Sequence, residues 1–319
     1  MPSNKKANKG EWSELLVFTK IANDAHIDMS NAKLQTLVGQ KLEISKILRD
    51  DIIFSISDAN KIFRTTTDGK IVEILKTTLP KRIKEFTSEI IAADGVFQSK
   101  WGNDLLDSFQ LSKIKAESNK KSDIDLTLTD PKTLLETNAG FSIKSYLGGL
   151  STLLNSSKQN TNFQFHVKNF KGNLSEVNAI KGSAKIRDRI AKIISNGGIF
   201  EFSKTKGDIF GRNLMKIDSL MPAILGNLTF ANFIITKKGK KILDVVQSNE
   251  LMELLKSLPI QLDADLISYK VKSLLLDIAL GMVPKKDWDG RQSADGGYIV
   301  VKETGEVVCF HVYNFADFS

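Results

Sequence analysis

The sequence is poor in the residues that build the common metal and redox sites. It contains one cysteine, Cys309, and three histidines, His26, His166 and His311, which lie far apart along the 319 residues. A single cysteine excludes an internal disulfide framework and a zinc site built from several thiolates. The scattered histidines exclude a zincin site, which needs two histidines one helical turn apart, and a nuclease site built on clustered His and Asn.

Long hydrophobic segments are also missing. The nearest approach is the apolar run 274–283, which Asp277 interrupts, and it falls well short of the roughly 20 residues that a membrane span needs. No apolar segment follows the polar start of the chain to form a signal peptide. We therefore expect a protein without a membrane partner that works in the cytoplasm.

Positive charge is present in excess. The chain has 45 Lys or Arg against 37 Asp or Glu, a net charge of +8 and a pI near 9.3. A basic protein favours polyanionic partners, because its cations release the counterions of nucleic-acid phosphates. Many soluble proteins are equally basic, so the charge becomes informative only beside a chemistry that acts on nucleic acids.

The first third of the chain reads as helical. Apolar residues recur at helical spacing over 30–49, and a second helical region is expected over 70–93, with Pro80 marking a break. We therefore predict a mainly helical N-terminal region, 1–95, as a candidate for DNA contact. The remainder, 96–319, is the predicted core domain.

The core mixes strands with helices. Strict alternation predicts a strand over 122–129 and shorter strands over 140–145 and 163–167. The connection between the first two is short enough for antiparallel pairing. Further expected elements are a C-terminal hairpin, 297–313, and four helical segments at 183–195, 213–230, 241–257 and 263–282. This pattern predicts an α/β or α+β fold.

Two strands bring chemistry together. Period-2 geometry places Asp123 and Asp125 on one face of the first strand, and Ser142 and Lys144 on one face of the second. If the strands pair, Asp123 and the main-chain carbonyl of Ile143 can hold Mg²⁺, which prefers oxygen ligands. Lys144 would then orient an attacking water and neutralise charge on the phosphate. The spacing alone favours a solvated face with a modest cross-strand ion pair, because an Asp followed some twenty residues later by a Lys is common.

Several blocks of sequence between residues 120 and 315 resemble the HpaII family of type II restriction endonucleases. The blocks are the segments 140–156, 161–163, 211–218, 281–284, 288–290 and 296–302, followed by the strand that contains Cys309. The resemblance implies a PD-(D/E)XK core, with a central mixed sheet flanked by helices, and Mg²⁺ as cofactor. It also implies double-stranded DNA as substrate, and the target of the family's namesake is the palindrome CCGG.

The chain departs from this family pattern in two places. Ser142 stands two residues before Lys144, where the motif name expects Asp or Glu. A second acidic metal ligand must then come from elsewhere, and Asp125, Glu136 and Glu89 are the open candidates. The ending at Ser319 looks abrupt for the family, and the sequence leaves open whether a short C-terminal piece follows it.

Polar residues near these motifs are candidates for DNA contact. The residues that follow Lys144 can bond phosphates or read base edges, although serine and asparagine also cap helices and close turns. A later Gly- and Asp-rich loop can enter a groove or remain solvated. The candidates are Ser145, Ser151, Thr152, Asn155, Asn162, Lys285, Lys286 and Arg291.

The combined prediction is a Mg²⁺-dependent type II restriction endonuclease that leaves 5′-phosphates, with Asp123, Ser142 and Lys144 as catalytic residues. Cleavage of both strands of a palindrome favours a homodimer on DNA, although a monomer that nicks each strand in turn remains an alternative. The alternative functions are a structure-specific or repair nuclease of the same fold and a non-cleaving DNA-binding protein. Ser142 in place of an acid is the feature that keeps the last alternative open.

Overall fold

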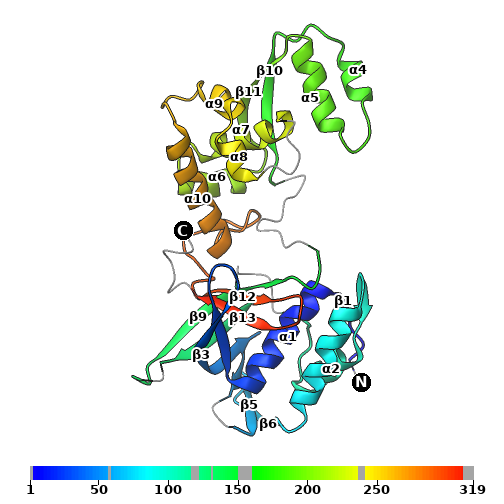
Figure 1. Cartoon of the computed structure of the whole chain (residues 1–319), viewed down its shortest axis with the longest axis vertical. Coiled ribbons are helices and arrows are strands. Elements are labelled where there is room, and N and C mark those ends of the chain that lie inside the picture. The colour runs from blue at the N-terminus through cyan, green and yellow to red at the C-terminus, as the bar shows by residue number, and fades with distance from the viewer. Residues whose placement is uncertain are drawn as a thin grey trace. The chain divides into compact units, whose positions relative to one another are not determined.

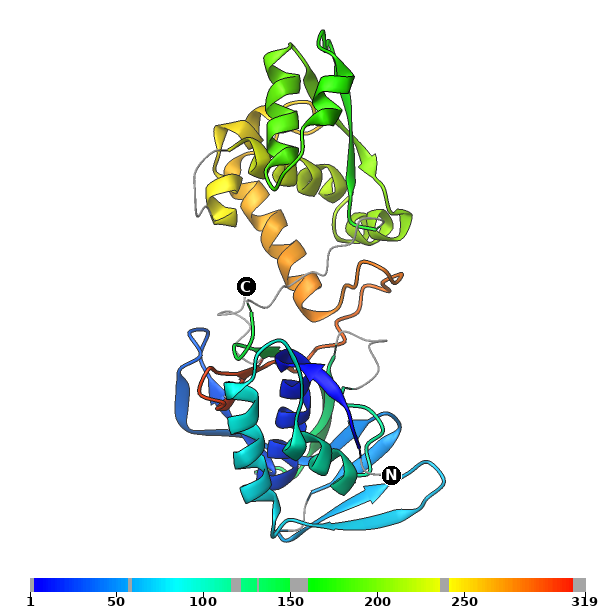
Figure 2. The same ribbon diagram turned by 90° about the vertical axis from the view of Figure 1, so that its right-hand side faces the viewer.

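The computed structural model describes residues 3–56, 59–115, 122–130, 132–149, 160–235 and 241–311. By its internal contacts the chain forms two compact units. Unit 1 comprises residues 1–153 and 291–319, and unit 2 comprises residues 154–290. Both units are drawn in Figures 1 and 2.

Unit 1 contains a large mixed sheet of nine strands. In spatial order these are β2 (His26–Ser30), β13 (Val307–His311), β12 (Gly297–Val301), β9 (Glu136–Ser145), β8 (Ile124–Thr129), β3 (Thr36–Arg49), β4 (Ile52–Ser55), β5 (Lys61–Thr65) and β6 (Ile71–Leu75). β12 runs parallel to β9, β13 runs parallel to β2, and the other neighbours are antiparallel. Because β2 also pairs with β3, the strands β2, β13, β12, β9, β8 and β3 form a closed ring of paired strands.

Three helices of unit 1 pack together: α1 (Lys9–Asp24), α2 (Leu79–Ala92) and α3 (Lys100–Ser108). Of these, α1 makes the main contacts with the sheet, and α2 and α3 pack on α1 (Figure 2). α1 begins at a capping box in which the side chain of Asn8 accepts from the N–H of Glu11 and Glu11 accepts from the N–H of Asn8. Its apolar residues share one core with those of the two central strands that carry the predicted site, β8 and β9. A small sheet of β1 (Lys6–Asn8) and β7 (Val96–Gln98) lies beside these helices.

Unit 2 is built on an antiparallel ribbon, β10 (Phe163–Lys168) and β11 (Ile199–Thr205), with helices around it. The helices are α4 (Leu174–Ala179), α5 (Lys185–Ser195), α6 (Asp208–Ile217), α7 (Met221–Ile234), α8 (Ile242–Val246), α9 (Asn249–Leu255) and α10 (Ala264–Leu280). Within the described ranges, no single helix is long and apolar enough to cross a membrane. α6 and α7 pass that test only as a pair, bent by 107°.

The expected helix over residues 30–49 is wrong, because this segment contains the long strand β3. A bulge between Ile44 and Lys46 shifts the phase of the strand. The buried residues consequently fall at Leu42, Ile44 and Ile47, and the interval of three imitates a helical turn. The second expected helix is correct over α2, but its first residues form β6.

Residues 1–95 therefore contain six strands beside two helices, and the description of this region as mainly helical is corrected. Strands from both sides of residue 95 lie in one sheet, since β3 pairs with β8. The strands expected over 122–129, 140–145 and 163–167 and the C-terminal hairpin are confirmed. The long helical segment 213–230 is divided at its proline, into α6 and α7.

Candidate active site

Asp123 directly precedes β8, at the place where β9 continues past the end of β8. This place, formed by Asp123 and residues 142–144 of β9, is called the corner below. Ile124 pairs with Phe141, so residues 142–145 of β9 extend past the end of β8. The N–H of Asp123 donates to the carbonyl of Phe141 over 2.8 Å, which continues the strand pairing by one step. The Asp123 side chain is thus held where β8 ends and β9 continues.

The Asp123 carboxylate is fixed by two hydrogen bonds to the same oxygen. Oδ2 accepts from the main-chain N–H of Ile143 at 2.7 Å and from the hydroxyl of Ser142 at 3.1 Å. Among the described residues no hydrogen bond reaches Oδ1. Since the N–H and C=O groups of one strand residue point to the same side, the Ile143 carbonyl also points toward Asp123.

The predicted pairing of the two strands is confirmed, and it places Ser142 and Lys144 on one face of β9. Ser142 is buried, whereas Lys144 is half-buried. On the other side of β9, Tyr298 of β12 lies opposite Ser142, and Val300 lies opposite Lys144. Lys144 therefore shares a strand face with the serine that contacts Asp123.

A second acidic residue comes from helix α1. The hydroxyl of Ser13 donates to the hydroxyl of Ser145 over 2.8 Å and connects α1 to β9. The next residue, Glu14, has a pKa raised to about 8, first because the carboxyl is buried and second because Asp123 is negatively charged. The positive charges of Lys115 and Arg49 act in the opposite direction. The Ser13–Ser145 contact brings this part of α1 to the end of β9, and the charge of Asp123 acts on the carboxyl of Glu14.

The sequence reasoning missed Glu14, although a signal was present. Glu14 is the only acid in the run from Trp12 to Phe18, which is otherwise apolar apart from Ser13, and the run follows the Asn8–Glu11 capping pattern. Tyr298 was missed as well, because it was read only as part of a strand. Burial and the charge of Asp123 both raise the pKa of its phenol, which places Tyr298 in the same corner.

The other candidate acids lie in different surroundings. Asp125 is on the same strand face as Asp123, opposite Gly140. Glu136 begins β9, six residues before Ser142 and so about 20 Å away along the strand. There it pairs with Lys46 at 2.7 Å, and hydrogen bonds from Lys46 and Ser45 lower its pKa.

Glu89 lies on α2, where its carboxylate accepts from the hydroxyl of Ser99 and from the N–H of Trp101 at the start of α3. It therefore caps a helix. The structure brings neither Glu89 nor Glu136 to Asp123.

The segment before β12 packs closely on β9. The N–H of Gly140 donates to Oδ1 of Asp295 over 2.7 Å, and its carbonyl accepts from the N–H of Gly296 at 2.8 Å. A Cβ at Gly140 would lie 2.2 Å from the carbonyl oxygen of Ser293, so only glycine fits. Arg291, a predicted DNA contact, is exposed in this segment.

The other predicted DNA contacts divide into three groups. Ser145 is buried, and its hydroxyl bonds Ser13 and the N–H of Leu147, so its observed role is to hold α1 against β9. Asn162, Lys285 and Lys286 are exposed in unit 2. The last group, Ser151, Thr152 and Asn155, lies outside the described residues.

The loop that carries Lys285 and Lys286 is held by one buried side chain. Asn213 accepts from the N–H of Trp288 at 2.9 Å, and its amide donates to the carbonyls of Lys286 and Val283 at 2.8 and 3.3 Å. These bonds fix the loop from three points, so the two lysines are presented on an ordered backbone.

The donors in the corner suit a hard divalent cation. The described ranges contain no group of three or more His, Cys, Asp or Glu that is arranged to hold a metal. The corner offers instead the carboxylates of Asp123 and Glu14 and the carbonyl of Ile143, and Mg²⁺ commonly combines one or two carboxylates with water. A cation there would favour the charged form of Glu14, whose pKa is raised first by burial and second by the charge of Asp123.

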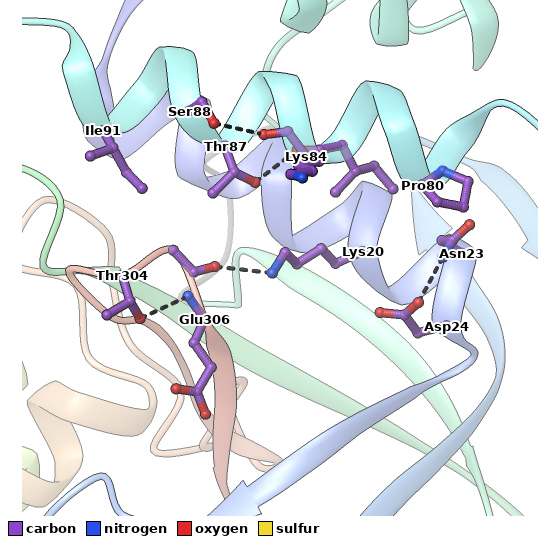
Figure 3. A pocket seen from close by; sticks show the side chains of 12 residues that line it. Lys20, Asn23, Asp24, Pro80, Lys84, Thr87, Ser88, Ile91, Thr304 and Glu306 are labelled. Carbon is purple, nitrogen blue, oxygen red and sulfur yellow. Dashed lines mark hydrogen bonds between the residues drawn. The ribbon is translucent and has the colours of Figure 1, made fainter.

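A separate cavity of about 590 Å³ lies farther along α1 (Figure 3). Its walls are the end of α1, the exposed side of α2 and the turn between β12 and β13. Lys20 spans part of it and donates to the carbonyl of Gly305 over 3.0 Å. None of the residues named above for the corner lines this cavity.

Known proteins resemble the chain over nearly its full length. Residues 8–319 match the model of the HpaII restriction endonuclease family. The chain is 34% identical to the type II restriction enzyme HpaII of Haemophilus parainfluenzae over 98% of its own length and 87% of the relative. No solved structure gives a significant match. The chain belongs to the HpaII restriction endonuclease family.

Proposed function

We propose that this restriction endonuclease hydrolyses duplex DNA with Mg²⁺ from the corner of β8 and β9, within a PD-(D/E)XK-type core. The observation that carries the proposal is the position of Asp123, fixed by Ile143 and Ser142 and opposed by the carboxylate of Glu14. Asp123 lies within reach of the Ile143 main chain, its charge acts on Glu14, and the chain belongs to a restriction endonuclease family. Glu14 supplies the acid that Ser142 does not.

Each residue of the corner has a distinct role in this proposal. Asp123, Glu14 and the carbonyl of Ile143 hold the Mg²⁺. When bound, Mg²⁺ polarises the phosphate and makes water a better nucleophile at neutral pH. Lys144 orients the attacking water and offsets the charge that grows on the phosphate oxygens. Ser142 keeps Asp123 in place, and the products carry 5′-phosphates.

The proposed substrate is a short palindrome of the CCGG type, as the resemblance to the HpaII family implies. A palindrome presents the same phosphodiester on both strands, related by a two-fold axis. Two copies of the chain related by the same axis place one corner on each strand, so a homodimer on DNA is the simplest assembly.

Digestion of a plasmid of known sequence tests the proposal. We expect discrete fragments with Mg²⁺ and none with EDTA, and ends that map to one short palindrome and ligate without prior phosphorylation. Fragments that arise only from branched or damaged DNA would indicate a structure-specific nuclease. Binding without cleavage under any divalent metal would indicate a non-cleaving DNA-binding protein, the alternative that Ser142 in place of an acid leaves open.

A further inference from the structure

The net positive charge of this protein is concentrated in unit 2. Residues 154–290 contain 21 Lys or Arg and 13 Asp or Glu, whereas the remainder of the chain contains 24 of each. Within unit 2, residues 160–206 hold nine basic and three acidic residues. This segment comprises β10, α4, α5 and β11 and carries six of the eight net charges (Figure 1).

The few acids in this segment are mostly neutralised by neighbours. Glu176 pairs with Lys192 at 2.6 Å, and Glu201 pairs with Lys168 at 2.7 Å. Five lysines remain exposed and form no ion pair within the described ranges: Lys171, Lys181, Lys185, Lys204 and Lys206. These five lysines, which lie in α5 and β11 or in the segments next to β10, α5 and β11, are together called the basic surface below.

The basic surface stands on an ordered scaffold. On one face of the ribbon, Phe165 and Phe200 pack on Phe230 of α7, with ring centroids 5.0 and 4.7 Å apart. Lys204 pairs with Gln164 near one end of the ribbon, and Lys171 follows the opposite end of β10. Six strand residues span about 20 Å, a length over which duplex DNA presents several phosphates.

The two arginines of α5 are engaged elsewhere. Arg187 donates to the carbonyl of Phe233 at 3.3 Å, and Arg189 donates to the carbonyls of Asn178 and Ile180 at 2.9 Å. Arginine is the residue that most often reads guanine with two hydrogen bonds, whereas lysine acts on phosphate as a point charge. The chemistry of the basic surface thus fits the DNA backbone better than base edges.

We propose that the basic surface binds the phosphate backbone of duplex DNA and supplies much of the sequence-independent affinity of the enzyme. This inference rests on the proposed function, because it takes DNA as the substrate. It assigns the holding of DNA to unit 2, apart from the chemistry in unit 1.

The test compares two fourfold variants of the full chain with equal charge change. The first replaces Lys171, Lys181, Lys185 and Lys204 by Gln. The matched control replaces four exposed lysines of unit 1, Lys33, Lys70, Lys81 and Lys132, by Gln. Binding to a fluorescent CCGG duplex and to a duplex without that sequence is measured in EDTA over a range of KCl, and circular dichroism checks folding.

For the first variant we expect at least a tenfold loss of affinity near physiological salt, equal on both duplexes. The slope of log K against log salt should be smaller by about 3 to 4, since each phosphate contact contributes about 0.9. The control should keep the wild-type slope. If the first variant is folded and its slope is unchanged, while the wild-type protein cleaves the plasmid, this inference is wrong and the proposed function stands. A loss confined to the CCGG duplex, or an equal loss in the control, also overturns this inference. If the wild type neither binds nor cuts DNA, both proposals fail.

Discussion

The main-chain N–H of Ile143 donates to Oδ2 of Asp123 over 2.7 Å. The bond joins the residue before β8 to a part of β9 that extends beyond it, so the carboxylate is held by backbone. Ser142 donates to the same oxygen, so a main-chain group and a hydroxyl together position Asp123. This arrangement predicts which substitutions abolish cleavage and which only weaken the positioning of Asp123.

Asp123→Asn and Lys144→Ala should each abolish cleavage, by at least about 10³-fold, while DNA binding changes by only a few fold. Asparagine keeps an acceptor for Ile143 but loses the charge that is proposed to hold Mg²⁺, and alanine removes the cation that is proposed to act on the phosphate. Plasmid cleavage in Mg²⁺ and duplex binding in EDTA measure the two effects, with Lys132→Ala as an exposed control. Cleavage retained by both variants would remove this site assignment.

Ser142→Ala should have a much smaller effect than either change. The serine hydroxyl supplies one of two hydrogen bonds to Asp123, and the N–H of Ile143 remains. A lost hydrogen bond to a charged group is worth about 1.5 kcal/mol, or roughly tenfold in rate. Single-turnover cleavage gives the comparison. Inactivity equal to that of Asp123→Asn would show that Ser142 takes part in the chemistry directly.

Glu14→Gln should make the metal-free protein more stable at alkaline pH. The folded pKa of Glu14, about 8, lies above the ordinary glutamate value of 4.5, so the folded protein binds this proton more tightly than the unfolded chain does. Its contribution to the free energy of unfolding is full below pH 4.5 and falls as pH rises toward 8. Glutamine has no proton to lose, so the variant should gain on the order of 3 kcal/mol over wild type near pH 9.

Urea unfolding in EDTA from pH 5 to pH 9 measures this difference, and repetition in Mg²⁺ should stabilise wild type more than the variant. The matched control is Glu11→Gln at the start of the same helix, whose carboxylate takes part in the capping box. Parallel pH profiles of wild type and Glu14→Gln would contradict the burial and repulsion assigned to Glu14.

Asn213→Ala should loosen the loop that carries Lys285 and Lys286. The side chain of Asn213 is fully buried and bonds three main-chain groups of that loop. Loss of these bonds leaves buried polar groups unpaired, at a cost of about 2 to 3 kcal/mol. Urea unfolding and amide exchange of residues 283–288 report the change, and Asn178→Ala at an exposed position serves as control. Unchanged exchange would mean that other contacts order the loop.

The strands of the site could be predicted because alternation over 122–129 is a local signal. β3 could not, since its bulge gives buried residues the interval of a helical turn. The position of Glu14 next to Asp123 is set by packing between segments more than a hundred residues apart, to which Ser13 and Ser145 contribute. The same packing explains why Ser145, expected to contact DNA, is instead buried.

β9 and β12 are neighbouring parallel strands, yet residues 146–296, which include all of unit 2, lie between them. At about 5–20 residues per second, a ribosome needs roughly 8 to 30 s to traverse that stretch. During this interval β8 and β9 exist without the strand that carries Tyr298. The corner proposed as the active site is therefore among the last parts of the described chain to be completed, and it is complete only after the unit proposed to hold DNA has been synthesised.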